Sequence, residues 1–172
     1  MTVCLTVVWL LVIAQALPAT AQFARFYDRD GGGGTGIKSI EIQNGPANVV
    51  VSINHNRYLD RDVVWLDTVR HDRGPEYRLL MYANSDVGSY RRVEGFTRGL
   101  GHPWRCNGVR MSSDNFDPGA WSYVRVPQSC LRGPGPVRVA TDSGDEDTGA
   151  YDDAPDWGTY EGYFTPWLSQ GD

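Results

Sequence analysis

IKSIEIQNGPANVVVSI, residues 37–53, is the stretch that decides the fold. Every second position in each half carries Ile or Val, which places these side chains on one face of an extended chain. The apolar positions are Ile40, Ile42, Val49, Val51 and Ile53. Asn44-Gly45 stands between the halves and is a strong signal for a two-residue hairpin turn. The stretch therefore predicts two antiparallel strands, each with one face toward a core.

Similar short runs recur along the chain, separated by turns rich in Gly, Pro and Asp, and helical periodicity is nearly absent. Residues 62–69 are apolar on both faces, which predicts a central strand. The other expected strands are 76–83, 89–96, 105–111, 121–126, a run at Val137 and Val139, and 160–164. The pattern predicts an all-β fold, a two-sheet antiparallel β-sandwich of about eight or nine strands.

The N-terminal residues differ from the rest. Residues 1–21 are almost wholly apolar and end in small side chains, the pattern of a secretory signal peptide cleaved after Ala21. An uncleaved anchor is the alternative, but a span needs about 20 apolar residues and this run is shorter. Removal of the signal leaves no transmembrane segment. We expect a secreted protein with a Gly/Asp-rich lead-in at 22–36 and one β-sandwich domain at 37–172.

Composition narrows the partners. The chain has a formal net charge of -5, and its basic residues are not clustered, which argues against nucleic acid. Of three cysteines, Cys4 lies in the expected signal peptide. Cys106 and Cys130 remain, and an even number in an oxidising compartment predicts one disulfide. The alternative, a pair of metal-binding thiols, lacks further ligands. Abundant Arg and Gly with scarce Lys indicate a GC-rich, actinobacterial source.

Two acidic segments are candidates for calcium, which prefers several oxygen ligands from loops. Asp28 and Asp30 precede a run of glycines, and residues 141–157 form a second acidic segment that we expect to be a loop. Neither segment has the spacing of an EF-hand. A solvated acidic loop beside a flexible linker explains the same residues, so no cofactor is required.

Aromatic residues supply a second candidate site. Sugars stack on aromatic faces through their C–H surfaces, while carboxylates and other polar groups bond the hydroxyls. A patch of this kind is expected at Tyr151, Asp153, Asp156, Trp157 and Tyr160. The alternative is that these rings fill the core or cover sheet edges. Trp65 and Trp121 are expected to be structural.

No catalytic motif stands out. His55, His71 and His102 lie in different turns, and neither a nucleophile-elbow nor a zinc-protease pattern is present. The sequence therefore favours a protein that is not an enzyme, and a hydrolase without a recognisable motif is the weakest hypothesis.

The order of short motifs resembles a known superfamily. Val63-Val64-Trp65-Leu66-Asp67-Thr68 is followed by Gly74-Pro75-Glu76-Tyr77-Arg78 and then by Val126-Pro127-Gln128-Ser129-Cys130-Leu131. This order resembles small exported actinobacterial β-sandwich proteins, which are distantly similar to DOMON domains and family 9 carbohydrate-binding modules. The resemblance implies a sandwich fold and ligand binding. The leading hypothesis is a secreted, non-catalytic module that binds carbohydrate or another cell-surface component. The alternative is an envelope structural or protein-interaction domain.

Overall fold

The strands account for most of the ordered chain. The computed structural model describes residues 21–28, 36–57, 60–71, 74–82, 88–96, 101–114, 119–132, 135–145, 149–155 and 164–171. They form eleven strands and one 3-10 turn: β1 (Gln22–Tyr27), β2 (Gly36–Asn44), β3 (Asn48–Arg57), β4 (Arg61–Asp67), β5 (Tyr77–Tyr82), β6 (Gly88–Arg92), β7 (His102–Pro103), β8 (Arg110–Asp114), β9 (Trp121–Pro127), η2 (Gln128–Cys130), β10 (Arg138–Gly144) and β11 (Tyr151–Ala154). No helix in this part of the chain is long and apolar enough to cross a bilayer.

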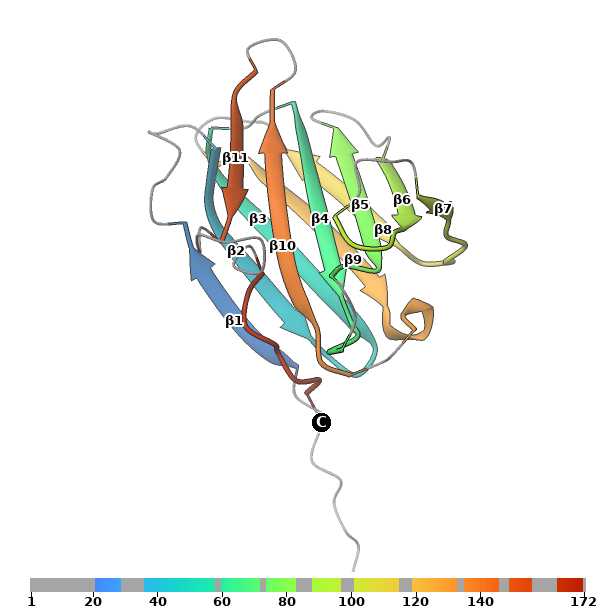
Figure 1. Cartoon of the computed structure of the whole chain (residues 1–172). Helices are drawn as coiled ribbons and strands as arrows, with labels where there is room; N and C mark the ends of the chain where they lie inside the picture. The colour runs from blue at the N-terminus through green and yellow to red at the C-terminus, as the bar shows by residue number, and fades with distance from the viewer. Residues whose placement is uncertain are drawn as a thin grey trace, which may run out of the picture.

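Two antiparallel sheets face each other (Figure 1). One has the order β1-β2-β3-β9-β8, and the other has the order β11-β10-β4-β5-β6-β7. The side chains between the sheets form the main core, which draws its largest members from both layers and includes Tyr77, Ile40 and Leu66. The predicted antiparallel β-sandwich is confirmed, with eleven strands among the described residues instead of eight or nine.

The hairpin at residues 37–53 forms as its pattern predicts. Ile40 lies opposite Ile53 and Ile42 lies opposite Val51, and all four side chains are buried between the sheets. The connection is longer than the predicted two-residue turn, because β2 ends at Asn44 and β3 begins at Asn48.

Strand β4 is central and covered on both faces. Val64 and Leu66 belong to the main core, whereas Val63 and Trp65 belong to a second cluster on the outer side of the six-stranded sheet. This confirms the central strand that the sequence predicts at residues 62–69. The second cluster is important for function, because it gives the outer face of this sheet an apolar floor.

The predicted disulfide is confirmed. Cys106 and Cys130 are joined with their Cα atoms 5.6 Å apart. The bond ties the segment before β8 to the η2 turn after β9. Cys106 shares the main core with Trp104, whose ring lies 4.4 Å from that of Tyr77. The disulfide therefore fastens one end of the sandwich beside its aromatic cluster.

Several local expectations were wrong. Strand β1 lies inside the predicted lead-in at 22–36 and pairs with β2, so the sandwich includes residues before position 37. The predicted strand at 105–111 begins only at Arg110. Glu76 was expected to face outward, but it is buried because its Oε2 accepts hydrogen bonds from the backbone N–H and the hydroxyl of Thr68.

Other expectations lie outside the described residues. These include residues 1–20 of the predicted signal peptide, Asp30, and all of the predicted strand at 160–164 except Phe164. Phe164 is not in a strand, but it packs in the second cluster with Val63 and Trp65. Farther along, Leu168 forms an antiparallel bridge to Val137, which ties this C-terminal segment to the start of β10.

Candidate functional site

A hollow lies on the outer face of the six-stranded sheet. Cross-strand partners share a face of a sheet, so the strand register shows which side chains stand together there. In sequence of rows across β11, β10, β4 and β5, the outer face carries Tyr151, Gly144, Arg61 and Tyr82, then Asp153, Asp142, Val63 and Leu80, and then Ala140, Trp65 and Arg78. Most of these residues line a groove of about 570 Å³, together with Phe96 and Thr141.

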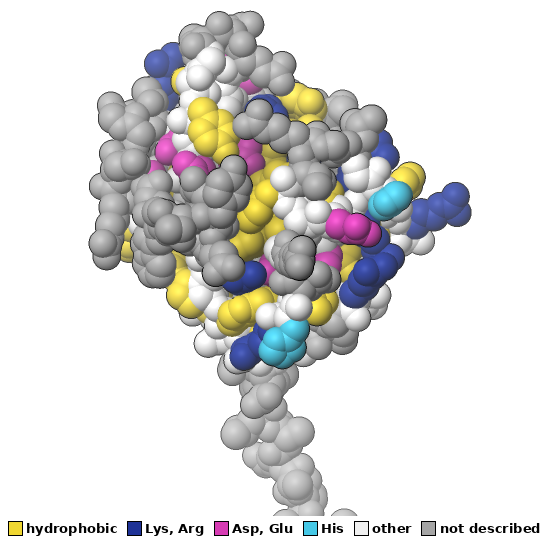
Figure 2. All heavy atoms as spheres, in the orientation of Figure 1, with side chains coloured by type: hydrophobic (Ala, Val, Ile, Leu, Met, Phe, Trp, Pro, Cys, Tyr) yellow, Lys and Arg dark blue, Asp and Glu magenta, His cyan; other side chains and the backbone are white. Residues whose placement is uncertain are grey.

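The groove exists because β10 carries small side chains between larger ones. Gly144 has no side chain and Ala140 has only a methyl group, whereas the flanking strands carry Tyr151, Arg61 and Trp65 at the same levels. Figure 2 shows hydrophobic side chains along the middle of this face, with acidic side chains beside them. The floor is apolar and the sides are charged, the usual composition of a small-molecule site.

The acidic segment 141–157 is not the loop that the sequence predicts. Its described residues form the end of β10 and all of β11, which pair with each other as a hairpin. Because side chains alternate along a strand, Asp142 and Asp153 face the groove together, whereas Asp152 faces the other sheet. There, Asp152 Oδ2 accepts a 2.6 Å hydrogen bond from the backbone N–H of Ile37.

Asp142 is held in place from the floor of the groove. The indole N–H of Trp65 donates a 2.7 Å hydrogen bond to Asp142 Oδ2. Burial raises the pKa of Asp142, while the hydrogen bond from Trp65 and the nearby charges of Arg61 and Arg78 act in the opposite direction. The carboxyl group is thus fixed in position and presented beside the hollow.

Arg78 lies against the other side of Trp65. Its guanidinium carbon is 5.5 Å from the centroid of the indole ring. Burial lowers the pKa of Arg78, and the charge of Arg61 lowers it further, while Asp142 raises it. The Nε atom of Arg78 is buried and has no hydrogen-bond partner within the described part of the chain. Arg78 therefore keeps unused hydrogen-bonding capacity beside the groove.

Aromatic rings provide the apolar surface. Trp65 is 8% exposed and makes an edge contact with Phe96, at 5.4 Å between ring centroids. Tyr151 is 61% exposed and stands at the other side of the groove. A flat apolar ligand could thus meet a ring at the rim and the apolar floor below it.

The sequence found part of this site. Tyr151 and Asp153 were both predicted as binding residues, and both line the groove. The other three predicted residues, Asp156, Trp157 and Tyr160, lie outside the described residues. Trp65 was expected to be structural, and it is buried as expected, but it also lines the groove. Trp121, by contrast, is 37% exposed and does not fill the core as expected.

Arg61, Arg78 and Asp142 were missed as site residues. The outward alternation of Arg61, Val63 and Trp65 was visible in the sequence, but it does not reveal that β10 lies beside β4. Residues 61–67 and 138–144 become neighbours only through the topology of the sheet.

The calcium expectation receives no described ligand set. Asp28 follows β1 directly, and its backbone N–H donates to the carbonyl of Lys38. Asp30 lies outside the described residues, so the structure does not bring the two carboxylates together. Within the described ranges, no three His, Cys, Asp or Glu side chains are grouped to hold a metal ion.

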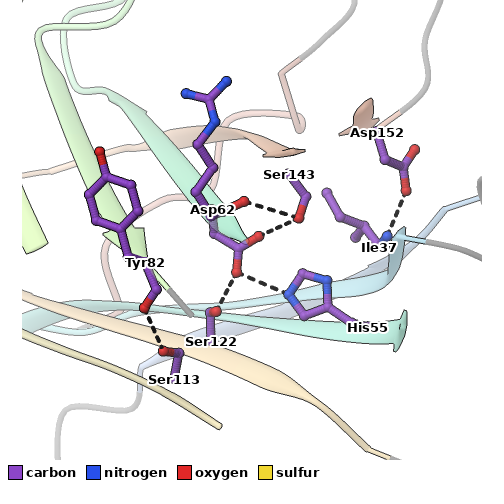
Figure 3. Close-up of polar contacts among 9 residues, drawn as sticks. Ile37, His55, Asp62, Tyr82, Ser113, Ser122, Ser143 and Asp152 are labelled. Atoms are coloured by element: carbon purple, nitrogen blue, oxygen red, sulfur yellow. Dashed lines mark hydrogen bonds and ion pairs between the residues drawn. The ribbon is translucent and has the colours of Figure 1, made fainter. Parts of the chain in front are cut away.

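A second polar cluster lies between the sheets (Figure 3). Asp62 Oδ1 accepts a 2.6 Å hydrogen bond from Ser143, and Asp62 Oδ2 accepts one from Ser122 and lies 3.1 Å from His55 Nε2. The carboxylate can only accept, so the ring nitrogen must carry the hydrogen of that bond. All four side chains are fully or almost fully buried.

These residue types resemble a Ser-His-Asp triad, but their arrangement differs. In a triad the serine donates to the histidine, whereas here the hydrogen of Ser122 goes to Asp62. A hydroxyl has one hydrogen, so it cannot donate to His55 at the same time. The cluster joins β3 and β9 of one sheet to β4 and β10 of the other. Its role is to hold the two layers together.

Comparisons with protein-family models, with curated proteins and with solved structures found no match. The functional argument therefore rests on the groove and on the chemistry of the residues that line it.

Proposed function

We propose that this protein is an exported, non-catalytic binding module and that the groove of its six-stranded sheet takes a segment of a carbohydrate chain. The carrying observation is that aromatic rings, guanidinium groups and carboxylates meet in one hollow. A sugar offers the matching surface, because its C–H faces are apolar and its edges carry hydroxyl groups. The groove volume of about 570 Å³ is within the usual range for ligand pockets.

The polar residues suit hydroxyl groups in particular. Asp142 and Asp153 are acceptors, whereas Arg61 and Arg78 are donors. A hydroxyl both donates and accepts, so it can bridge the two kinds of group. Trp65 fixes Asp142 beforehand, which reduces the ordering cost of binding.

Export is supported by the signal-like residues 1–21 and by the disulfide, because disulfides persist mainly in oxidising compartments. A chain outside the cytoplasm would meet the polysaccharides of cell envelopes and of its surroundings. A polysaccharide is thus the ligand class that suits both the groove and the compartment.

The test is affinity electrophoresis of the mature protein against a panel of neutral and acidic polysaccharides, followed by titration calorimetry with any polymer that retards it. Tyr151→Ala removes the exposed ring of the groove and is expected to weaken binding by about tenfold or more, since stacking on one ring contributes about 1–2 kcal/mol. Tyr27→Ala is the matched control, because Tyr27 is 63% exposed on β1, in the other sheet.

Two results would count against the proposal. If no polysaccharide retards the protein, or if Tyr27→Ala weakens retention as much as Tyr151→Ala, then the groove is not a carbohydrate site. Release of new reducing ends during incubation would show that the protein is an enzyme instead of a passive module.

A further inference from the structure

The charges of the groove are separated, and this separation indicates the kind of sugar. Asp142 and Asp153 stand on β10 and β11, whereas Arg61 and Arg78 stand on β4 and β5. We infer that the groove binds an acidic polysaccharide, with a sugar carboxylate against Arg78 and sugar hydroxyls against Asp142 and Asp153. The inference rests on the proposed carbohydrate-binding function and adds the class of sugar to it.

Arg78 carries the argument for a carboxylate. Its Nε–H is buried without a partner in the described part of the chain, and its guanidinium lies over the face of Trp65 instead of against an acceptor. A planar guanidinium matches a carboxylate through two parallel hydrogen bonds, which a lone hydroxyl cannot form. A partly buried cation without a bonded acceptor is costly, so a ligand carboxylate would relieve that cost.

The acidic side of the groove does not already satisfy Arg78. Asp142 Oδ2 is engaged by the indole N–H of Trp65, and the register places Asp142 opposite Val63, one row away from Arg78. Asp153 stands one strand farther away, on β11. Arg61 adds a second positive charge on the β4 side, which favours a negative ligand group there.

An acidic sugar fits both sides at once. A uronic acid carries one carboxylate and several hydroxyls on the same ring, so its negative edge can face β4 and β5 while its hydroxyl edge faces β10 and β11. A neutral sugar would leave the guanidinium of Arg78 without a charged acceptor. A cationic ligand would meet two like charges on the β4–β5 side.

The experiment compares polymers that differ only in the carboxylate. Polygalacturonate, alginate and hyaluronan are each tested against their methyl-esterified forms by titration calorimetry with the mature protein. We expect at least one acidic polymer to bind about tenfold or more tightly than its ester. Arg78→Gln is expected to weaken binding of that polymer by about 10- to 100-fold, because hydrogen bonds to charged groups are among the stronger ones. The same variant should change binding of the ester by less than about threefold.

Arg91→Gln is the matched control. Arg91 pairs with Arg78 across β5 and β6, so it stands on the same face and the change in net charge is identical, but it does not line the groove. Its binding is expected to stay within about threefold of the parent protein. Circular dichroism and urea unfolding of each variant check that the sheet is intact.

Each other outcome is informative. Equal binding of acid and ester, still lost in Tyr151→Ala, would overturn the acidic-sugar inference and leave the proposed function standing. Binding of no polymer would overturn both. Equal losses in Arg78→Gln and Arg91→Gln, or equal affinity for dextran sulfate, would show a general charge effect and overturn the specific role of Arg78.

Discussion

Asp62 is the residue whose removal should disturb the fold most. Its carboxylate accepts from Ser122 and Ser143 and lies 3.1 Å from His55 Nε2, and these groups come from both sheets. Asp62→Ala leaves these three polar groups buried without their acceptor. A buried group that loses its partner costs about 1–3 kcal/mol, which gives about 3–9 kcal/mol if the three costs add.

Neighbouring groups do not add fully, because the remaining side chains can rearrange toward one another. We therefore expect Asp62→Ala to lower the free energy of unfolding by about 3–5 kcal/mol, the range for breaking one side of a buried ion pair. This is a large part of the stability of a small domain, which is about 5–15 kcal/mol in total.

The assay is urea unfolding of the mature protein with the disulfide intact. Ser122→Ala removes one of the three contacts and should cost about 1.5–3 kcal/mol. Ser113→Ala is its matched control, because Ser113 lies opposite Ser122 in the register but its hydroxyl bonds only at 3.3 Å to the carbonyl of Tyr82, in an exposed position. That control should change stability by less than about 0.5 kcal/mol. If Asp62→Ala costs under about 1 kcal/mol with an unchanged m-value, the polar cluster does not hold the sheets together.

Three further predictions concern the disulfide and the groove. Reducing the bond between Cys106 and Cys130, which are 24 positions apart, should lower the free energy of unfolding by about 3 kcal/mol in urea with and without reductant; an unchanged midpoint would contradict this. Because burial raises the pKa of Asp142, ionisation of its carboxyl group should destabilise the fold. The stability of the parent protein relative to Asp142→Asn should therefore be highest below the unfolded pKa and fall as the pH rises through the folded pKa; a difference independent of pH would refute it. Gly144→Val places atoms where an added Cβ would already lie 3.2 Å from Arg61 Nε, so it should abolish polysaccharide retention while a thermal melt shows a folded protein; undiminished retention would show that this part of the groove is unused.

Local signals predicted the parts of the fold whose stabilising partners are close in sequence. The hairpin at residues 37–53 follows from period-two alternation and a turn signal, and β4 follows from apolar residues on both faces. The pairing of Cys106 with Cys130 follows from the number of cysteines. None of these predictions needed knowledge of distant strands.

The β10–β11 hairpin could not be predicted in this way. Asp and Gly are depleted in strands, so an acidic segment indicates a loop. Its acidic residues are tolerated because distant groups bond them: Trp65 donates to Asp142, and the backbone of Ile37 donates to Asp152. Tyr151 and Asp153 were recognised by residue type alone, whereas Arg61 and Arg78 needed the order of strands in the sheet.

The alternation of β10 and β11 separates two kinds of evolutionary freedom. Asp152 and Ser143 face the interior, whereas their chain neighbours Asp153 and Asp142 face the groove. Mutational libraries confined to the groove-facing positions could thus alter ligand preference without touching the layer contacts. The same hairpin offers a scaffold for engineered lectins, in which specificity is diversified one residue out of two.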